Sequence, residues 1–193
     1  MRRGHLKAAR PTGFKAQASD LRLDTGATHL IQQAMTESTP ALTSPGRQNF
    51  IRDVMDGEWK GWSASANDPF NDTTGPFYVR AQDDGSVLCA MRVEKKHLNG
   101  GDMMHGGAFM TFADFCLFAF ASGLGDDDSV TLSFNCEFLK GVPQGATVYG
   151  TGEVIRRTRR MVFVRGLMRV DDVAVFSFSG VLTKLPSAAA TPA

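Results

Sequence analysis

The stretch GGAFMTFADFCLFAFASG, residues 106–123, tells most about the fold. Its spacing is helical, and apolar side chains fall on nearly every side of that helix. A helix without a polar face must be wrapped by other structure. The apolar run is shorter than the ~20 residues that span a bilayer, and Asp114 lies in its middle. A buried soluble helix is therefore predicted, and the glycine at its end is a typical stop.

Segments with strand patterns lie on both sides of this helix. We expect two strands before it and four after it, at 75–81, 87–93, 129–140, 147–155, 161–170 and 173–183. A short amphipathic helix is expected at 48–55 and a loop at 57–74. The order β-β-α-β-β-β-β predicts an α+β fold, with an antiparallel sheet of about five to six strands wrapped round one long central helix.

The length of 193 residues fits one domain. Residues 1–46 lack sustained periodicity and end in a Pro-rich stretch, so a disordered or extended tail is expected there. Met35 is an alternative translation start within that tail. The predicted domain covers residues 47–186, and 187–193 form a C-terminal tail.

Charge and cysteine content exclude several classes of protein. The formal net charge of +1 gives no general attraction to nucleic acid or to a membrane surface. Cys89, Cys116 and Cys136 lack metal-ligand or redox spacing, and an odd number argues against a disulfide framework. Small core residues in a reducing compartment are the favoured interpretation, which predicts a cytoplasmic protein. A nucleophilic Cys116 is the alternative.

The segment NGGDMMHGG, residues 99–107, runs directly into the central helix. Gly106 and Gly107 leave room for a close approach to the backbone. First-turn amides have no partners within a helix, and the helix dipole makes this end partly positive. Such an end can polarise a carbonyl or hold an oxyanion during acyl transfer. The alternative is a tight turn in which His105 only caps the helix.

Asp114 lies about two turns into the most apolar helix of the chain. An unpaired carboxylate buried there would be costly, so it must be paired, reach water or serve chemistry. A carboxylate in a partly desolvated cleft can act as a general base toward water or as a nucleophile on a thioester carbon. The structural alternative is a bond to nearby backbone or to Thr111, one turn earlier.

The spacing of these two candidates predicts an oligomer. Gly106 and Asp114 are eight residues apart, about 12 Å along a helix. One carbonyl cannot contact both groups of one chain, because hydrogen bonds reach only about 3 Å. Two antiparallel helices from two subunits could bring one chain's Gly106 beside the other's Asp114. We therefore expect a homo-oligomer whose active site is shared between subunits.

The strongest local charge cluster is Arg156, Arg157, Arg159 and Arg160. Guanidinium groups suit phosphate, so Arg157, Arg159 and Arg160, with Lys140, are candidates for binding the phosphates of coenzyme A. A solvated hairpin tip is the alternative.

Taken together, Asn99, the triplet His105-Gly106-Gly107, Asp114 and the Val130-Thr131 pair resemble the phenylacetate-pathway (PaaI-like) group of hotdog-fold acyl-CoA thioesterases. The resemblance covers roughly residues 75–185. It implies hydrolysis of an acyl-CoA thioester, in which Asp114 activates water or attacks directly. Gly106 would polarise the carbonyl with help from Asn99, Thr131 would orient water, and His105 and Gly107 would lie against the substrate.

The resemblance also implies a homodimer or homotetramer, with no metal or redox cofactor. Two other readings stay open. A non-catalytic acyl-CoA-binding sensor on the same fold is the first, and a hotdog dehydratase is the second. Neither an added DNA-binding helix pair nor a basic domain supports a regulator. The preferred acyl group, whether aryl-acetyl, medium-chain or long-chain, is not determined by the sequence.

Overall fold

The computed structural model describes residues 51–122 and 129–185. The predicted tails at 1–46 and 187–193, the alternative start at Met35 and the expected stop at Gly123 lie outside the described residues. Within the described ranges, no helix combines the length and the apolar character needed to cross a bilayer.

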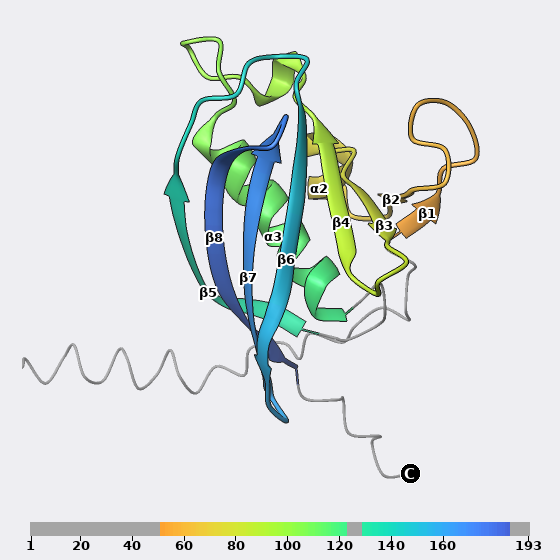
Figure 1. Cartoon of the computed structure of the whole chain (residues 1–193), viewed down its shortest axis with the longest axis vertical. Coiled ribbons are helices and arrows are strands. Elements are labelled where there is room, and N and C mark those ends of the chain that lie inside the picture. The colour runs from red at the N-terminus through yellow and green to blue at the C-terminus, as the bar shows by residue number, and fades with distance from the viewer. Residues whose placement is uncertain (1–50, 123–128, 186–193) are drawn as a thin grey trace, which may run out of the picture. The chain divides into compact units, whose positions relative to one another are not determined.

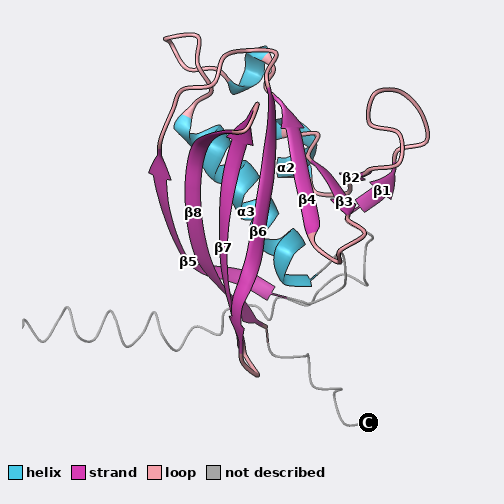
Figure 2. Ribbon diagram, in the orientation of Figure 1, coloured by secondary structure: helices cyan, strands magenta, loops and turns pink. Residues whose placement is uncertain are grey.

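One antiparallel sheet dominates the described part of the chain, where it has eight strands in the order β1-β2-β3-β4-β6-β7-β8-β5 (Figures 1 and 2). The strands are β1 (Ile51–Asp53), β2 (Ser63–Ser65), β3 (Tyr78–Ala81), β4 (Val87–Arg92), β5 (Ser129–Phe138), β6 (Thr147–Arg157), β7 (Met161–Val170) and β8 (Val173–Lys184). The helical segments are α2 (Pro69–Thr74), the 3-10 turn η1 (Lys95–His97) and α3 (Gly106–Ser122). The sheet curves round α3, which lies behind the central strands in Figure 1. The predicted α+β architecture with one central helix is confirmed.

The chain before β3 differs from expectation. The helix predicted at 48–55 is wrong over its described residues, because Ile51–Asp53 forms β1 and pairs with β2. Its apolar spacing covered barely two turns, a length at which isolated helices are marginal and pairing at a sheet edge can win. The segment predicted as a loop, 57–74, contains β2 and α2. Both short strands extend the sheet beyond the six expected strands.

Three glycines allow α3 to pack closely on the sheet. Gly150 and Gly152 lie on β6 and Gly180 lies on β8. A Cβ at Gly150 would lie 2.8 Å from the sulfur of Cys116, and a Cβ at Gly180 would overlap Leu117. At Gly152 the added carbon would meet the ring of Phe120. These glycines set the depth at which α3 sits and therefore the height of its side chains above the sheet.

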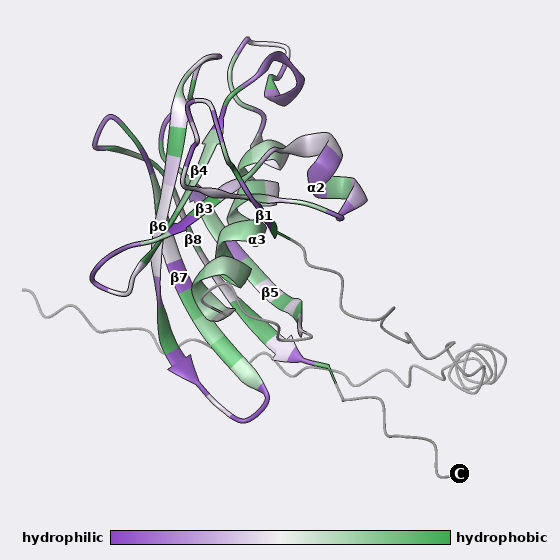
Figure 3. Cartoon of the chain, turned by 90° about the vertical axis from the view of Figure 1, so that its right-hand side faces the viewer, coloured by the Kyte–Doolittle hydropathy of each residue, from purple (hydrophilic) through white to green (hydrophobic). Residues whose placement is uncertain are grey.

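Among the described residues, the closest cover of α3 is on its sheet-facing side. On the other side, Gly107 and Met110 are exposed, and Thr111, Asp114 and Phe118 are half-buried. The α2 helix lies on the same side of the sheet as α3 (Figure 3). The described part of the chain therefore leaves one side of this nearly all-apolar helix partly exposed.

The strand β5 forms one edge of the sheet. It pairs with β8 along one side over most of its length. Val130, Leu132 and Phe138 of this strand are 42%, 58% and 56% exposed. A long edge strand with exposed apolar side chains is a ready template for pairing with another chain.

Candidate active site

Asp114 lies in the middle of α3, and its side chain is half-buried. The hydroxyl of Thr131, near the start of β5, donates a hydrogen bond to Asp114 Oδ1 at 2.6 Å. Burial raises the pKa of the Asp114 carboxyl, the Thr131 hydrogen bond partly opposes this rise, and the charge of Asp68 adds to it. The carboxylate is therefore a stronger base than an exposed aspartate.

The contacts of Asp114 leave it able to act on water. The Thr111 hydroxyl, the alternative partner considered from the sequence, donates to the Gly107 carbonyl at 2.9 Å. Among the described residues, no donor contacts the second carboxylate oxygen of Asp114. A carboxylate held by one hydroxyl and half open to solvent has the geometry of a general base.

The start of α3 presents one unused amide. His105 caps the helix, because its Nδ1 accepts from the Gly107 amide at 2.9 Å and its carbonyl accepts from Ala108 and Phe109. His105 therefore does cap the helix, as the alternative interpretation expected, and its side chain occupies the Gly107 amide. No acceptor for the Gly106 amide lies within the described residues. Gly106 therefore offers the donor that an oxyanion would need.

Two neighbours shape the approach to Gly106. A Cβ on Gly106 would lie 3.2 Å from the ring of Phe138, at the end of β5, so the glycine allows close contact there. The side-chain carbonyl of Asn99 accepts from the amides of Gly101 and Met103, at 2.8 and 3.3 Å. These two bonds shape the turn before α3 and use the oxygen of the Asn99 side chain, so its NH2 group remains as the possible donor to a ligand.

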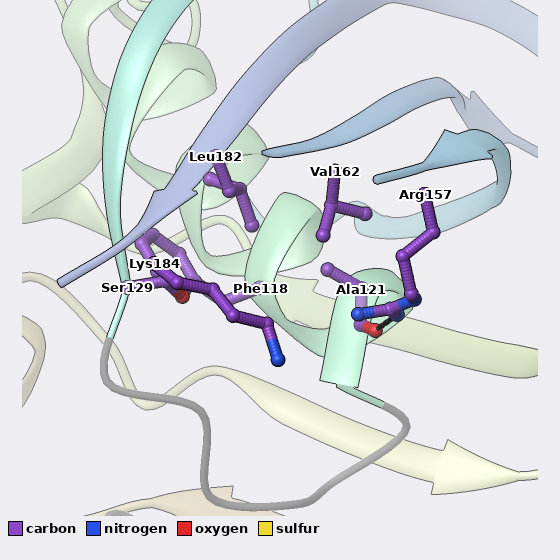
Figure 4. A pocket seen from close by; sticks show the side chains of 7 residues that line it. All are labelled: Phe118, Ala121, Ser129, Arg157, Val162, Leu182 and Lys184. Carbon is purple, nitrogen blue, oxygen red and sulfur yellow. Dashed lines mark hydrogen bonds between the residues drawn. The ribbon is translucent and has the colours of Figure 1, made fainter. Parts of the chain in front are cut away.

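The predicted cations lie at opposite ends of α3. Lys140 follows Phe138 and so lies near the Gly106 end. The guanidinium of Arg157 donates to the Ala121 carbonyl at the C-terminal end of α3 (Figure 4). The 17 residues of α3 separate these ends by about 24 Å. Arg159 and Arg160 are exposed on the β6–β7 hairpin, and the predicted phosphate-binding role of Arg157, Arg159 and Arg160 stays a prediction.

A small surface gap lies beside Arg157, again at the C-terminal end of α3. Its lining side chains come from α3 and four strands (Figure 4): Phe118, Ala121, Ser129, Arg157, Val162, Leu182 and Lys184. Neither Asp114 nor the Gly106 turn lines this gap. This pocket is therefore separate from the candidate catalytic groups.

Cys116 is fully buried between α3 and the sheet. Burial, reinforced by the neighbouring Cys89, raises the pKa of the Cys116 thiol well above its usual value. A protonated, inaccessible thiol is a core residue, which removes the nucleophilic alternative. Among the described residues, no group of three His, Cys, Asp or Glu side chains is placed to hold a metal ion.

Two residues near the site were not predicted from the sequence. Asp68 caps α2, since its Oδ1 accepts from the amides of Phe70 and Asn71, both at 3.0 Å. The sequence Asp68-Pro69 carries the signal of an N-cap followed by proline at the first helical position, so α2 could have been found. His97 is 4% exposed, and no local pattern in the sequence indicates that burial.

Comparison with known proteins places the chain in a family. The profile of the Thioesterase superfamily matches residues 101–176, which span the Gly106 turn, α3 and Thr131. A Pseudomonas aeruginosa protein named "Putative esterase PA0474" is 30% identical over 115 residues, which cover 58% of this chain and 86% of that protein.

Solved structures agree on the fold. The PaaI protein from the phenylacetic acid degradation operon of E. coli aligns with a TM-score of 0.55 at 22% identity, over 62% of this chain and 86% of that chain. A mutant of the phenylacetic acid degradation protein PaaI from Thermus thermophilus aligns with a TM-score of 0.53 at 28% identity, over 61% of this chain and all of that one (100%). The chain therefore belongs to the thioesterase superfamily, and within it to the hotdog thioesterases of the PaaI type.

Proposed function

We propose that this protein hydrolyses an acyl-CoA thioester to the free acid and CoA, with Asp114 as the catalytic carboxylate. The observation that carries the proposal is the half-buried Asp114, which is bonded to Thr131 and whose pKa is raised mainly by burial. Membership of the thioesterase superfamily supports hydrolysis as the reaction class. The unused Gly106 amide supports carbonyl activation.

Each group has a role in the proposed reaction. Asp114 takes a proton from water as the water oxygen attacks the thioester carbon. The carbonyl oxygen becomes an oxyanion, which the Gly106 amide stabilises with help from Asn99. When the C–S bond breaks, the CoA thiolate leaves and takes up the proton, and the acid is released. Direct attack by Asp114 would instead form an anhydride that water then cleaves, with the same products.

The active site is proposed to be shared between two subunits. Asp114 and Gly106 are eight residues apart on one continuous helix, so within one chain they are too far apart to contact the same carbonyl group. The uncovered side of α3, around Met110 and Asp114, and the exposed edge of β5 are the surfaces that a second copy would cover. Antiparallel pairing of the two helices would place each Gly106 turn beside the partner's Asp114, in a homodimer or a dimer of dimers.

The CoA portion is assigned to the Gly106 end of α3 by the chemistry of the groups there. His105, Gly107 and Lys140 lie at that end of one protomer. Arg159 and Arg160 lie at the other end and would reach the same ligand only from the partner subunit. Cations of this kind suit the phosphates of CoA.

The test compares wild type with Asp114→Asn over aryl-acetyl, medium-chain and long-chain acyl-CoA substrates, with release of free CoA thiol as the readout. Asn can still accept from Thr131 but cannot take a proton, so kcat should fall by roughly 10²–10⁴-fold. Calorimetric binding of CoA should survive. The control Asp72→Asn changes an exposed aspartate of α2 and should leave kcat intact.

Three outcomes would contradict the proposal. Binding without hydrolysis by the wild type over the whole panel would favour the sensor. Elimination of water from a β-hydroxyacyl-CoA would favour the dehydratase. Full activity in Asp114→Asn would remove Asp114 from the chemistry.

A further inference from the structure

Residues 66–76 form a closed loop that carries α2, here named the α2 loop. Its ends meet at the sheet, where the Ser65 amide donates to the Phe77 carbonyl at 2.8 Å and the Phe77 amide donates to the Ser65 hydroxyl at 3.3 Å. The Phe77 ring packs on Phe115 of α3, with centroids 5.4 Å apart. Because Phe115 directly follows Asp114, the base of the α2 loop is fixed next to the candidate catalytic carboxylate.

His97 holds the C-terminal end of α2. Its Nδ1 accepts from the Glu94 amide at 2.9 Å. Nε2 therefore carries the ring proton and donates to the Thr74 carbonyl, 2.6 Å away. Beside it, the ammonium of Lys96 donates to the Gly75 carbonyl. A helix of six residues has little stability of its own, so these anchors determine where α2 lies.

The same histidine also fixes the start of α3. The backbone carbonyl of His97 accepts the His105 amide at 2.7 Å. His105 caps α3 immediately before Gly106. One residue thus contacts the α2 loop through its side chain and the Gly106 turn through its backbone.

The cost of this arrangement suggests that it serves more than stability. Among the described residues, Ser65 and His97 are the two buried polar side chains, 6% and 4% exposed. His97 makes a hydrogen bond to Thr74 in the α2 loop, and Ser65 makes one to Phe77 where the loop ends. A hydrogen bond between buried polar groups adds little net stability over well-packed apolar groups. What it does provide is a defined position for the loop, including Asp68, whose charge acts on Asp114.

We propose that His97 is a positioning residue of the hydrolysis, which holds the α2 loop against α3 as one wall of the acyl site and keeps that wall in register with the Gly106 turn. This inference rests on the proposed function. It predicts that the bond from Nε2 to Thr74 matters for turnover beyond its effect on stability.

Two substitutions distinguish the hydrogen bond made by Nε2 of His97 from the one made by Nδ1. In Gln, the amide nitrogen lies as many bonds from Cβ as Nε2 does in His, so His97→Gln can keep the donor to Thr74. In Asn, the side-chain oxygen lies as many bonds from Cβ as Nδ1, so His97→Asn can keep the acceptor for Glu94 and loses the bond to the α2 loop. The two variants are otherwise matched, since each buries one amide.

We expect kcat/KM of His97→Asn to fall by about 10-fold or more, the effect of one lost buried hydrogen bond, with His97→Gln nearer to wild type. Rates are measured with the preferred acyl-CoA well below the melting temperature of each variant. Amide hydrogen exchange should be faster in residues 70–75 of His97→Asn than of His97→Gln. Equal kcat/KM in the two variants, or losses that simply follow their melting temperatures, would overturn the proposal.

Failure of the proposed function gives a different result. If wild type hydrolyses no thioester, the enzymatic assignment fails, and the exchange experiment still reports whether His97 holds the α2 loop. If wild type is active and Asp114→Asn is inactive while both His97 variants match wild type, hydrolysis stands and the positioning role is lost.

Discussion

At the scale of single residues, the environment of Asp114 controls the pH dependence of the proposed reaction. Asp114 must be ionised to act as the base. Burial is the main cause that raises the pKa of the Asp114 carboxyl, and the charge of Asp68 raises it further. Asp68→Asn removes that charge yet keeps a good N-cap for α2. The acid limb of the kcat/KM profile should therefore move to lower pH in Asp68→Asn. The profile of Asp72→Asn, which changes an exposed carboxylate on the same helix, should match wild type.

Asp114 should also limit stability. A carboxyl whose pKa is raised by folding holds its proton more tightly in the folded protein, so its stabilising contribution is present below the unfolded pKa and is lost as pH rises through the folded pKa. Asp114→Asn is therefore expected to melt at a higher temperature than wild type at neutral pH. The difference should shrink as the pH is lowered toward about 4, near the pKa of an unperturbed aspartate. Thermal unfolding followed by circular dichroism checks both points, and an equal gain at both pH values would contradict the assignment.

Single residues also show where sequence reasoning succeeds and where it stops. Asp114 could be found because a carboxylate stands out in an apolar helix, and Thr131 because the family resemblance marks it. His97 could not be found, because its burial depends on partners at positions 74 and 94 that only the fold brings together. Arg157 was predicted from charge clustering as a ligand for phosphate, and that role stays a prediction. Its contact with the Ala121 carbonyl at the end of α3 depends on the fold and could not be predicted.

At the scale of elements, the long strands and α3 were predictable because each shows a sustained pattern of the right period. The segment before β3 was not. β1 is three residues long, and its strand conformation comes from pairing Ile51 with Ser65 rather than from its own preference. The α2 helix had a readable start at Asp68-Pro69, but its six residues are too few to show periodicity.

The start of α3 allows a direct test of the backbone donor. Gly106 is the first residue of the helix, the position at which proline is best tolerated. Gly106→Pro removes the amide hydrogen, and kcat should fall by roughly 10²–10³-fold, as for loss of one oxyanion donor. Gly106→Ala keeps the amide and adds a methyl group 3.2 Å from Phe138, so it controls for crowding. Similar kcat values in the two variants would point to crowding rather than to the donor.

At the scale of the whole molecule, the shared site can be tested by mixing inactive chains. Asp114→Asn and Gly106→Pro damage different halves of the proposed site. A mixed dimer would contain one site with both defects and one with neither. Random mixing makes half of the dimers mixed, so co-expression should restore about a quarter of wild-type activity. Activity no higher than that of the separate variants would show that both groups act within one chain.

The glycines under α3 have a practical meaning for redesign. Gly150, Gly152 and Gly180 leave the helix no slack on its sheet side, because even one added carbon would collide with a side chain of α3. A larger residue there would push against α3, and we expect this to disturb the contact between Asp114 and Thr131. An engineer who wants the protein to accept a bulkier acyl group should leave these three glycines unchanged. The side chains of α2, none of which is buried, are the better positions to vary, provided that the contact between His97 and Thr74 is kept.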